Sequence, residues 1–176
     1  MLVDKHCKRM AIDITEKHQK SRNGNEYMLT VRDHFTKWAE AYPLRDHKAP
    51  TVAKVSVDQL FSRWGMPFQL LSDQIPEFGS ELFLEMCRAL GIDKIRTSPY
   101  RLACNGMLER YHGTLNSMIG KIVSENELDW DTRVPFVMIA YRASVHDATS
   151  FTPNFLAFGR VVRASLISFW ASQRKR

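Results

Sequence analysis

The sequence is poor in cysteine, glycine and proline, with 3, 8 and 7 of these residues among 176. Cys7, Cys87 and Cys104 lie far apart and form no C-x-x-C pair. Because an odd number of thiols cannot all pair, a disulfide-built scaffold is disfavoured and a reducing compartment is favoured. His6 stands beside Cys7 without a second, spaced pair of ligands, so the sequence predicts no zinc site.

Long hydrophobic runs are also missing. The apolar runs are well short of the roughly 18 residues that suggest a membrane span, and no apolar secretory segment follows Met1. The sequence therefore predicts no membrane partner. Its composition, 44% hydrophobic and 25% charged, is typical of a globular protein, and its length suits one domain.

Positive charge exceeds negative charge. The chain has 25 Lys and Arg against 19 Asp and Glu, a net charge of +6, and its pI is about 9.4. This imbalance favours a polyanionic partner such as nucleic acid, although a basic composition alone does not identify one.

The first part of the chain has the pattern of antiparallel strands. Apolar alternation predicts strands over residues 9–15, 27–33 and 37–44, with Pro43 ending the third. The Asn-Gly pair within "SRNGNEY" is a hairpin signal, so short turns are expected between these strands.

The pattern becomes helical after these strands. A helix is predicted from Pro50 to a stop at Gly65, and a second one over residues 80–91 with Ser80 as its cap. Strands at 67–73 and 93–98 flank the second helix, which implies a right-handed crossover between parallel neighbours. The predicted fold is α/β: a mixed five-stranded sheet of three antiparallel strands with parallel additions, flanked by helices on both faces.

Two more helices are expected towards the end of the chain. Residues 106–125 carry an apolar stripe at helical spacing. The stretch "WDTRVPFVMIAYRASVH" predicts a last helix in which Pro135 makes a kink or marks the start of the regular part. Its expected buried residues are Trp130, Val134, Val137 and Tyr141.

Three carboxylates lie within these predicted elements or at their ends. Asp13 lies within the first strand, Asp73 ends the fourth, and Glu109 begins the long helix, with 35 residues between the last two. A charge in a central strand is costly unless it is paired or bound to a metal. Taken singly, Asp73 is also a turn former and Glu109 a favourable partner of a helix dipole, so structural roles stay open at this point.

Several longer motifs give the three acids a context. They are "AIDIT", "GNEYMLTVRDHFTKWAEAYPL", "LLSDQIPEF", "NGMLERYHGTLNSM" and "PFVMIAYRASVHDATSFTPNFLAFGR". With these motifs the chain resembles the catalytic core domain of retroviral-type integrases, closest to the Ty3/Gypsy class of long-terminal-repeat retrotransposons. The resemblance implies a ribonuclease H-like fold, a core domain over residues 1–163, and a basic tail at 164–176.

The resemblance also implies a function and a site. Asp13, Asp73 and Glu109 would be the catalytic triad and would hold two Mg²⁺ (or Mn²⁺) ions, with Asp13 bridging both. Two such ions suit in-line displacement at a phosphodiester. Integrases trim a DNA 3′ end with water and then use its hydroxyl to attack target DNA. The implied nucleic-acid-binding residues are Asn105, Gly106, Arg110 and His112.

Further expectations follow from the same resemblance. The partners would be DNA and further copies of the chain, in a homodimer or higher multimer. The location would be the nucleus, with a cytoplasmic element particle as the alternative.

The chain departs from the family pattern at three places. It has Ile75 and Ser150 where relatives have glycine, and Glu16-Lys17 where they have Gly-Pro. Glycine usually marks positive φ, so backbone strain of about 1–3 kcal/mol is expected at Ile75. These departures keep an alternative open: an element-derived core that has lost catalysis and serves as a nucleic-acid or protein binding module. A ribonuclease acting on RNA–DNA hybrids would share the fold and the metals.

Overall fold

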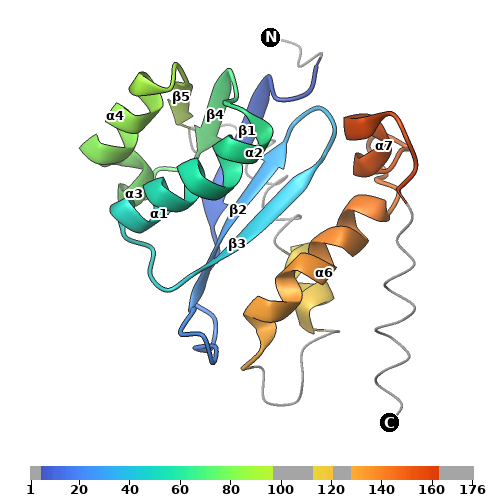
Figure 1. The fold of residues 1–176 in the computed structure, drawn as a ribbon, viewed down its shortest axis with the longest axis horizontal. Helices are drawn as coiled ribbons and strands as arrows, with labels where there is room; N and C mark the ends of the chain where they lie inside the picture. The colour runs from blue at the N-terminus through green and yellow to red at the C-terminus, as the bar shows by residue number, and fades with distance from the viewer. Residues whose placement is uncertain (1–4, 97–112, 121–127, 163–176) are drawn as a thin grey trace.

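Five strands form one mixed sheet in the order β3-β2-β1-β4-β5 (Figure 1). The structure is a computed structural model and describes residues 5–96, 113–120 and 128–162. The strands are β1 (Arg9–Ile14), β2 (Tyr27–Asp33), β3 (Ala39–Leu44), β4 (Gln69–Ser72) and β5 (Asp93–Arg96). β2 pairs antiparallel with β1 and β3, whereas β4 pairs parallel with β1 and β5. The predicted mixed sheet is therefore confirmed.

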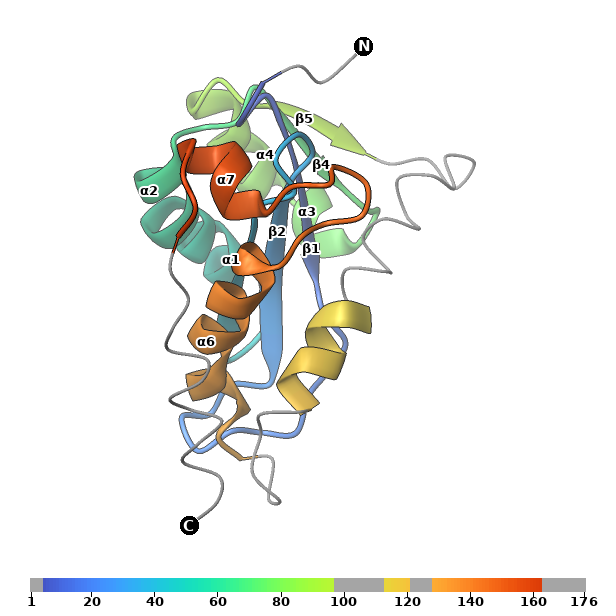
Figure 2. The same cartoon turned by 90° about the vertical axis from the view of Figure 1, so that its right-hand side faces the viewer.

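Helices cover both faces of this sheet (Figures 1 and 2). Residues 113–120 are helical and belong to the predicted helix 106–125, whose other residues mostly lie outside the described ranges. The named helices are α1 (Ala49–Val55), the π-helical segment η1 (Ser56–Phe61), α2 (Ser62–Trp64), α3 (Pro76–Gly79), α4 (Glu81–Ala89), α6 (Trp130–Ala143) and α7 (Pro153–Phe158). The predicted helix from Pro50 to Gly65 thus contains a π-helical segment that the apolar spacing did not indicate.

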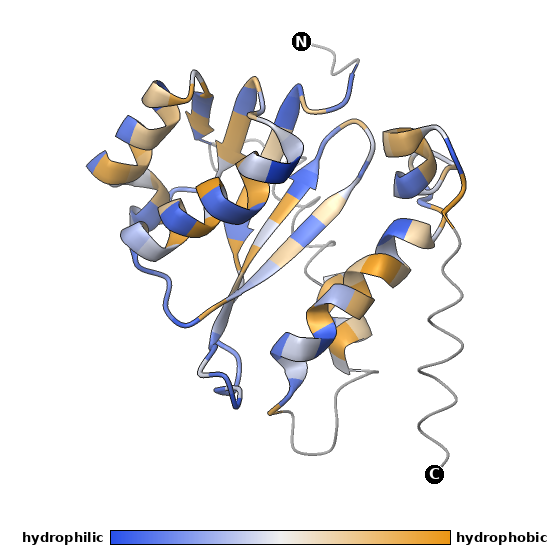
Figure 3. Cartoon of the chain, in the orientation of Figure 1, coloured by the Kyte–Doolittle hydropathy of each residue, from blue (hydrophilic) through white to orange (hydrophobic). Residues whose placement is uncertain are grey.

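Side-chain alternation in the strands gives the molecule two apolar layers. Met10 and Ile12 of β1 face the layer under α1 and α4, while Met28 of β2 faces the layer under α6 and residues 113–120. Figure 3 shows β4 hydrophobic along most of its length and the loop before β2 hydrophilic. The residues expected to be buried in α6 are all buried: Trp130, Val134, Val137 and Tyr141.

The Asn-Gly turn prediction is confirmed, although the strands end well before the turn. β1 ends at Ile14 and β2 begins at Tyr27, and the Gly24 N–H donates to the Ser21 carbonyl oxygen at 2.9 Å, so residues 21–24 form the tight turn at the tip of a long hairpin connection. The loop asparagines also bind the start of α6. Oδ2 of Asp131 accepts hydrogen bonds from Ser21 Oγ (2.7 Å), Asn23 Nδ2 (3.0 Å) and Asn25 Nδ2 (2.7 Å).

Two prolines lie inside elements, one at a predicted strand end and one at a predicted kink or start of regular helix. Pro43 does not end β3 but pairs with Met28 within it. β3 is an edge strand, where a proline without an N–H is tolerated. Pro135 lies inside α6, with helical residues on both sides. Ser80 caps α4 as predicted, since its Oγ accepts a hydrogen bond from the Phe83 N–H.

Candidate active site at the ends of β1 and β4

The parallel pairing of β1 with β4 brings the first two predicted acids together. Ala11 is the partner of Leu71, and continuing this register by two residues places Asp13 opposite Asp73. Both carboxylates therefore lie at the carboxyl edge of neighbouring parallel strands. In open α/β sheets this edge is the usual place for ligands.

The electrostatics of Asp13 confirm that the two carboxylates are close. Burial, and then the negative charge of Asp73, raise the pKa of Asp13 to about 7, against the lowering effect of a hydrogen bond from the Ile14 N–H. Burial also raises the pKa of Asp73, while the Ile75 N–H and Lys94 lower it. The charge of Asp73 is thus one of the causes that disfavour ionisation of Asp13.

These acids fit a divalent cation. A partly buried carboxylate beside a second one is unfavourable as a bare pair of charges, and a cation between them would remove that cost. Carboxylate oxygens are also the ligands that Mg²⁺ prefers. Within residues 5–96, 113–120 and 128–162, no group of three His, Cys, Asp or Glu could hold a metal ion. Glu109, which the sequence predicts as a third ligand, lies outside these residues.

Five predicted site residues lie outside the described ranges. They are Asn105, Gly106, Glu109, Arg110 and His112. Their roles stay predictions. The structure accordingly brings together Asp13 and Asp73 of the predicted triad.

Lys94 is a residue of the site that sequence analysis missed. Its Nζ donates to Ser72 Oγ, and Ser72 Oγ donates to the carbonyl oxygen of Asp73 at 2.8 Å. Burial lowers the pKa of Lys94 to about 8. This chain of contacts fixes the end of β4 that carries Asp73. Only the register between β4 and β5 reveals it, because no motif marks Lys94.

The strain predicted at Ile75 is not present. Ile75 has φ −60° and ψ 147°, an ordinary extended conformation, and caps α3. Its side chain packs against the core under α1 and α4 rather than into the site. Ser150, by contrast, has the positive φ that a glycine in relatives suggests, with a value of +58°. Lys17 forms an exposed ion pair with Glu26 at 2.6 Å.

Glycine substitutions at these two positions should therefore have opposite effects. Ser150→Gly should stabilise the fold by about 0.5–1 kcal/mol, because it removes the cost of a left-handed residue. Ile75→Gly should destabilise it by about 1–3 kcal/mol, because packing is lost and no strain is relieved. Urea unfolding of both variants measures this difference, and a gain in stability from Ile75→Gly would contradict it.

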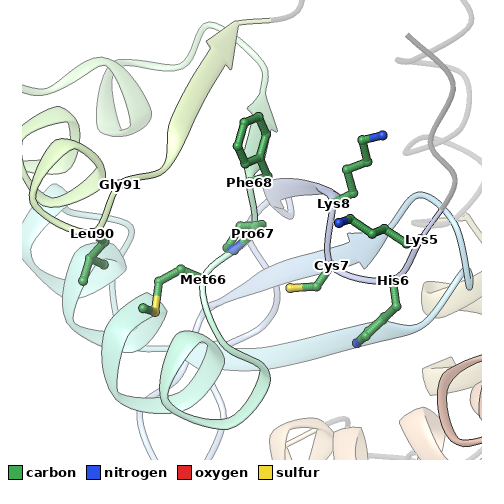
Figure 4. Close-up of a pocket in the computed structure, with 9 residues that line it drawn as sticks. All are labelled: Lys5, His6, Cys7, Lys8, Met66, Pro67, Phe68, Leu90 and Gly91. Atoms are coloured by element: carbon green, nitrogen blue, oxygen red, sulfur yellow. The ribbon is translucent and has the colours of Figure 1, made fainter.

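A separate hollow of about 480 Å³ lies at the opposite ends of the strands, where β1, β4 and β5 begin. Figure 4 shows Lys5 and Lys8 on one side of it and Met66, Phe68 and Leu90 along the other. The strands β1 and β4 run between this hollow and the two carboxylates, so it is not part of the candidate active site.

The mixed five-stranded sheet with helices on both faces has a ribonuclease H-like fold. The family described as "Integrase core domain" matches residues 5–102, more than half of the chain. The chain belongs to this integrase core domain family. The resemblance to retroviral-type integrase cores is thus confirmed, whereas assignment to the Ty3/Gypsy class stays a prediction.

Relatives in sequence are polyproteins of mobile elements and retroviruses. The retrovirus-related Pol polyprotein from transposon 412 of Drosophila melanogaster is 28% identical over 152 residues, 86% of this chain. The Gag-Pol polyprotein of Koala retrovirus is 33% identical over 132 residues, 74% of this chain. The chain spans only 12% and 8% of these two proteins.

Solved structures share the fold. The integrase catalytic core domain of HTLV-2 in complex with magnesium, in its dimeric form, has a TM-score of 0.70 and 18% identity, covering 86% of this chain and 97% of that one. An intasome of simian T-cell lymphotropic virus, in complex with the PP2A regulatory subunit B56 gamma, has a TM-score of 0.76 and 20% identity, covering 90% and 57%. No helix in the described part of the chain is long and apolar enough to cross a membrane.

Proposed function

We propose that this chain is the catalytic core of a DNA integrase, a polynucleotidyl transferase that processes DNA 3′ ends and transfers them into a second DNA. The observation that carries the proposal is the placement of Asp13 and Asp73 at adjoining ends of β1 and β4, with mutual repulsion that a cation would relieve. Membership of the integrase core domain family gives this pair its substrate class.

Each residue of the site has a definite task in this proposal. Asp13, Asp73 and the predicted Glu109 would hold divalent metal, with two Mg²⁺ or Mn²⁺ ions as the expected number. Bound metal supplies charge neutralisation and lowers the pKa of an attacking water or hydroxyl. The Ile14 N–H donates to Asp13 at 2.8 Å, and the Ile75 N–H donates to Asp73 at 3.3 Å. Each of these two bonds favours the ionised form of its carboxyl group, the form that would bind a metal ion.

DNA and further copies of the chain are the proposed partners. The net charge of +6 suits a polyanion. The HTLV-2 core is described in dimeric and trimeric forms, which supports assembly as a homodimer or higher multimer here. A nuclear location would follow from this activity, with an element particle in the cytoplasm as the alternative.

The test is metal-dependent cleavage or disintegration of branched DNA. The purified chain should show activity with Mg²⁺ or Mn²⁺, and Glu109→Gln should reduce it to the level seen with EDTA. Glu16→Gln, at an exposed position, is the matched control and should retain activity. If the wild type binds DNA but stays as inert as Glu109→Gln with either metal, the enzyme proposal is wrong. The chain would then be the inactive, element-derived binding module.

A further inference from the structure

Three side chains in contact cross the carboxyl end of β1, the edge of the sheet that carries the two acids of the candidate site. Nδ1 of His47 lies 2.5 Å from Oε1 of Glu77. The ring of His47 also packs on the ring of Tyr27, with 4.7 Å between the ring centres. We call these three residues the His47 bridge. None of them was predicted as a site residue.

The His47 bridge joins elements on the two sides of β1. Tyr27 is the first residue of β2, and the last residue of β1 pairs two positions further along β2, so Tyr27 lies just beyond the carboxyl end of β1. Glu77 belongs to α3, which follows β4 on the other side of β1. His47 lies in the connection between β3 and α1, and Figure 1 shows this connection reaching α1 next to α3.

The hydrogen bond of the bridge has a definite direction. An ionised carboxylate can only accept, so Nδ1 of His47 carries the proton and donates to Glu77. The backbone beside His47 is held as well, because Oδ1 of Asp46 accepts from the Lys48 N–H at 3.0 Å just before α1 begins. The side chain of Glu77 is only 15% exposed, so little water is present to replace His47 as its partner.

Glu77 is close to Asp73 both along the chain and in space. Oδ1 of Asp73 accepts from the Ile75 N–H, and Ile75 is the residue that caps α3. Burial is the main cause that raises the pKa of Asp73, and the charge of Glu77 adds to it, so the two carboxylates are near enough to interact. A rotation of α3 would therefore move the N–H group that holds the carboxylate of Asp73.

Two apolar side chains also hold α3, but they leave one movement open. Phe78 is 1% exposed and packs against Phe83, and Ile75 packs against the same core. Residues three apart on a helix share a face, and apolar packing has no preferred direction. These two anchors therefore allow α3 to rotate about the line that joins them. Glu77 adds a third point of attachment, and its hydrogen bond is directional.

We propose that His47 is a positioning residue of the metal site: through Glu77 it fixes α3, and with α3 the carboxylate of Asp73, in the orientation that binds a divalent cation. This inference rests on the proposed function, because it takes Asp73 as a metal ligand. It needs no contact of His47 with metal or DNA. The side chain of His47 is 48% exposed, and an exposed pair adds little to global stability, so the effect of the bridge is expected at the site.

The test compares Mn²⁺ binding by two variants, His47→Asn and His47→Ala. The amide nitrogen of Asn can replace Nδ1 as the donor to Glu77, whereas Ala has no donor. Both variants lose the ring and any charge on it, so the hydrogen bond is the main difference between them. His47→Ala should weaken Mn²⁺ binding about fivefold, the size expected for loss of one hydrogen bond. His47→Asn should weaken it less than about twofold. The EPR signal of free Mn²⁺ measures both.

Glu77→Gln and Glu77→Ala repeat the comparison from the other end of the hydrogen bond. Gln keeps an acceptor for Nδ1 and Ala does not, so Glu77→Ala should bind Mn²⁺ more weakly than Glu77→Gln. This pair keeps the proposal testable if His47→Ala fails to fold, which thermal unfolding shows. Lys54→Ala is the control, because it breaks an exposed ion pair with Asp58 on α1. It should change Mn²⁺ binding by less than about twofold.

Two results would overturn the proposal. One is the same Mn²⁺ affinity in wild type, His47→Ala and His47→Asn. The other is equal weakening in both His47 variants, which would assign the effect to the ring rather than to the hydrogen bond.

Cleavage of branched DNA separates this proposal from the enzyme function. If Mn²⁺ binding responds as expected in a protein that cleaves no DNA, the enzyme function alone is wrong. If the wild type cleaves DNA but all variants bind Mn²⁺ equally, the positioning role alone is wrong. A wild type that binds no Mn²⁺ overturns both. In an active enzyme, saturating Mn²⁺ should restore cleavage by His47→Ala, because the bridge acts on metal affinity.

Discussion

Asp13→Asn should raise the stability of the metal-free protein by about 3 kcal/mol at pH 8, while it reduces metal-dependent DNA cleavage by at least about a thousandfold. The two effects have one cause. The carboxylate of Asp13 is held where burial and Asp73 oppose its ionisation. The charged carboxylate of Asp13 therefore destabilises the metal-free fold, but it is required for metal binding.

The sign follows from the raised pKa. In the unfolded chain an Asp titrates near 3.8, whereas Asp13 in the folded chain titrates at about 7. Between these values the folded state binds more protons, so stability falls as the pH rises through this window. The whole pKa shift corresponds to about 4 kcal/mol. The expected gain in stability is smaller, because Asn loses some favourable contacts of the carboxyl group. At about pH 4 the advantage of Asn should therefore be close to zero.

Chemical unfolding from about pH 4 to 8, with EDTA and with Mg²⁺, measures this effect. Mg²⁺ should stabilise the wild type, and more at pH 8 than at pH 6, because the ion competes with the proton on Asp13. It should leave Asp13→Asn nearly unchanged. The exposed Glu16→Gln is the control for loss of one acid. Equal stability of Asp13→Asn and wild type at pH 8 without metal would show that the carboxylate is not strained.

Asp131→Ala should destabilise the fold by about 3 kcal/mol, since it removes the shared acceptor of three side chains in a partly buried site. Ser21, Asn23 and Asn25 all donate to Oδ2 of Asp131. Burial alone would raise the pKa of Asp131, but these hydrogen bonds hold it below the usual value. The stability that Asp131 supplies is therefore present above about pH 4 and is lost as the pH falls through its lowered pKa.

Asp129→Ala is the matched control for this prediction. Asp129 is two residues away and pairs with Arg133 at 2.7 Å, with both side chains about one fifth exposed. Its loss removes one Arg–carboxylate pair rather than an acceptor shared by three side chains, so it should cost less, about 1–2 kcal/mol. Thermal unfolding of the two variants at neutral pH compares them. Similar losses in both would mean that the three donors find other acceptors, and that the loop is not held by Asp131.

The sheet and the acid pair were predictable because they depend on local patterns. Alternation located β2 with its observed bounds, and a strand followed by a helix and a strand required parallel neighbours. Asp13 is the last but one residue of β1 and Asp73 follows β4, so the parallel pairing of these strands had to bring the two acids together. The motif context supplied the substrate class.

The remaining features depend on contacts between distant residues. Arg32 and His146 are 114 positions apart, and nothing in either segment predicts their contact. The Asn-Gly pair forms the turn that its sequence predicted, but nothing in that stretch predicted its hydrogen bonds to Asp131. At Ile75 the family's glycine suggested positive φ, and the backbone instead follows an extended path into α3. A residue type indicates which backbone conformations and contacts are possible at a position, and the fold determines which of them is present.

The central place of β1 in the sheet also determines when the site around Asp13 unfolds. β1 has hydrogen-bonded strands on both sides, β2 and β4. Central strands open only in the highest-energy fluctuations of a domain, close to global unfolding. The backbone at Asp13 is therefore not expected to unfold locally, apart from the rest of the domain. Partial unfolding at the edge strands β3 and β5 would leave it in place, so this part of the site is as long-lived as the native state itself.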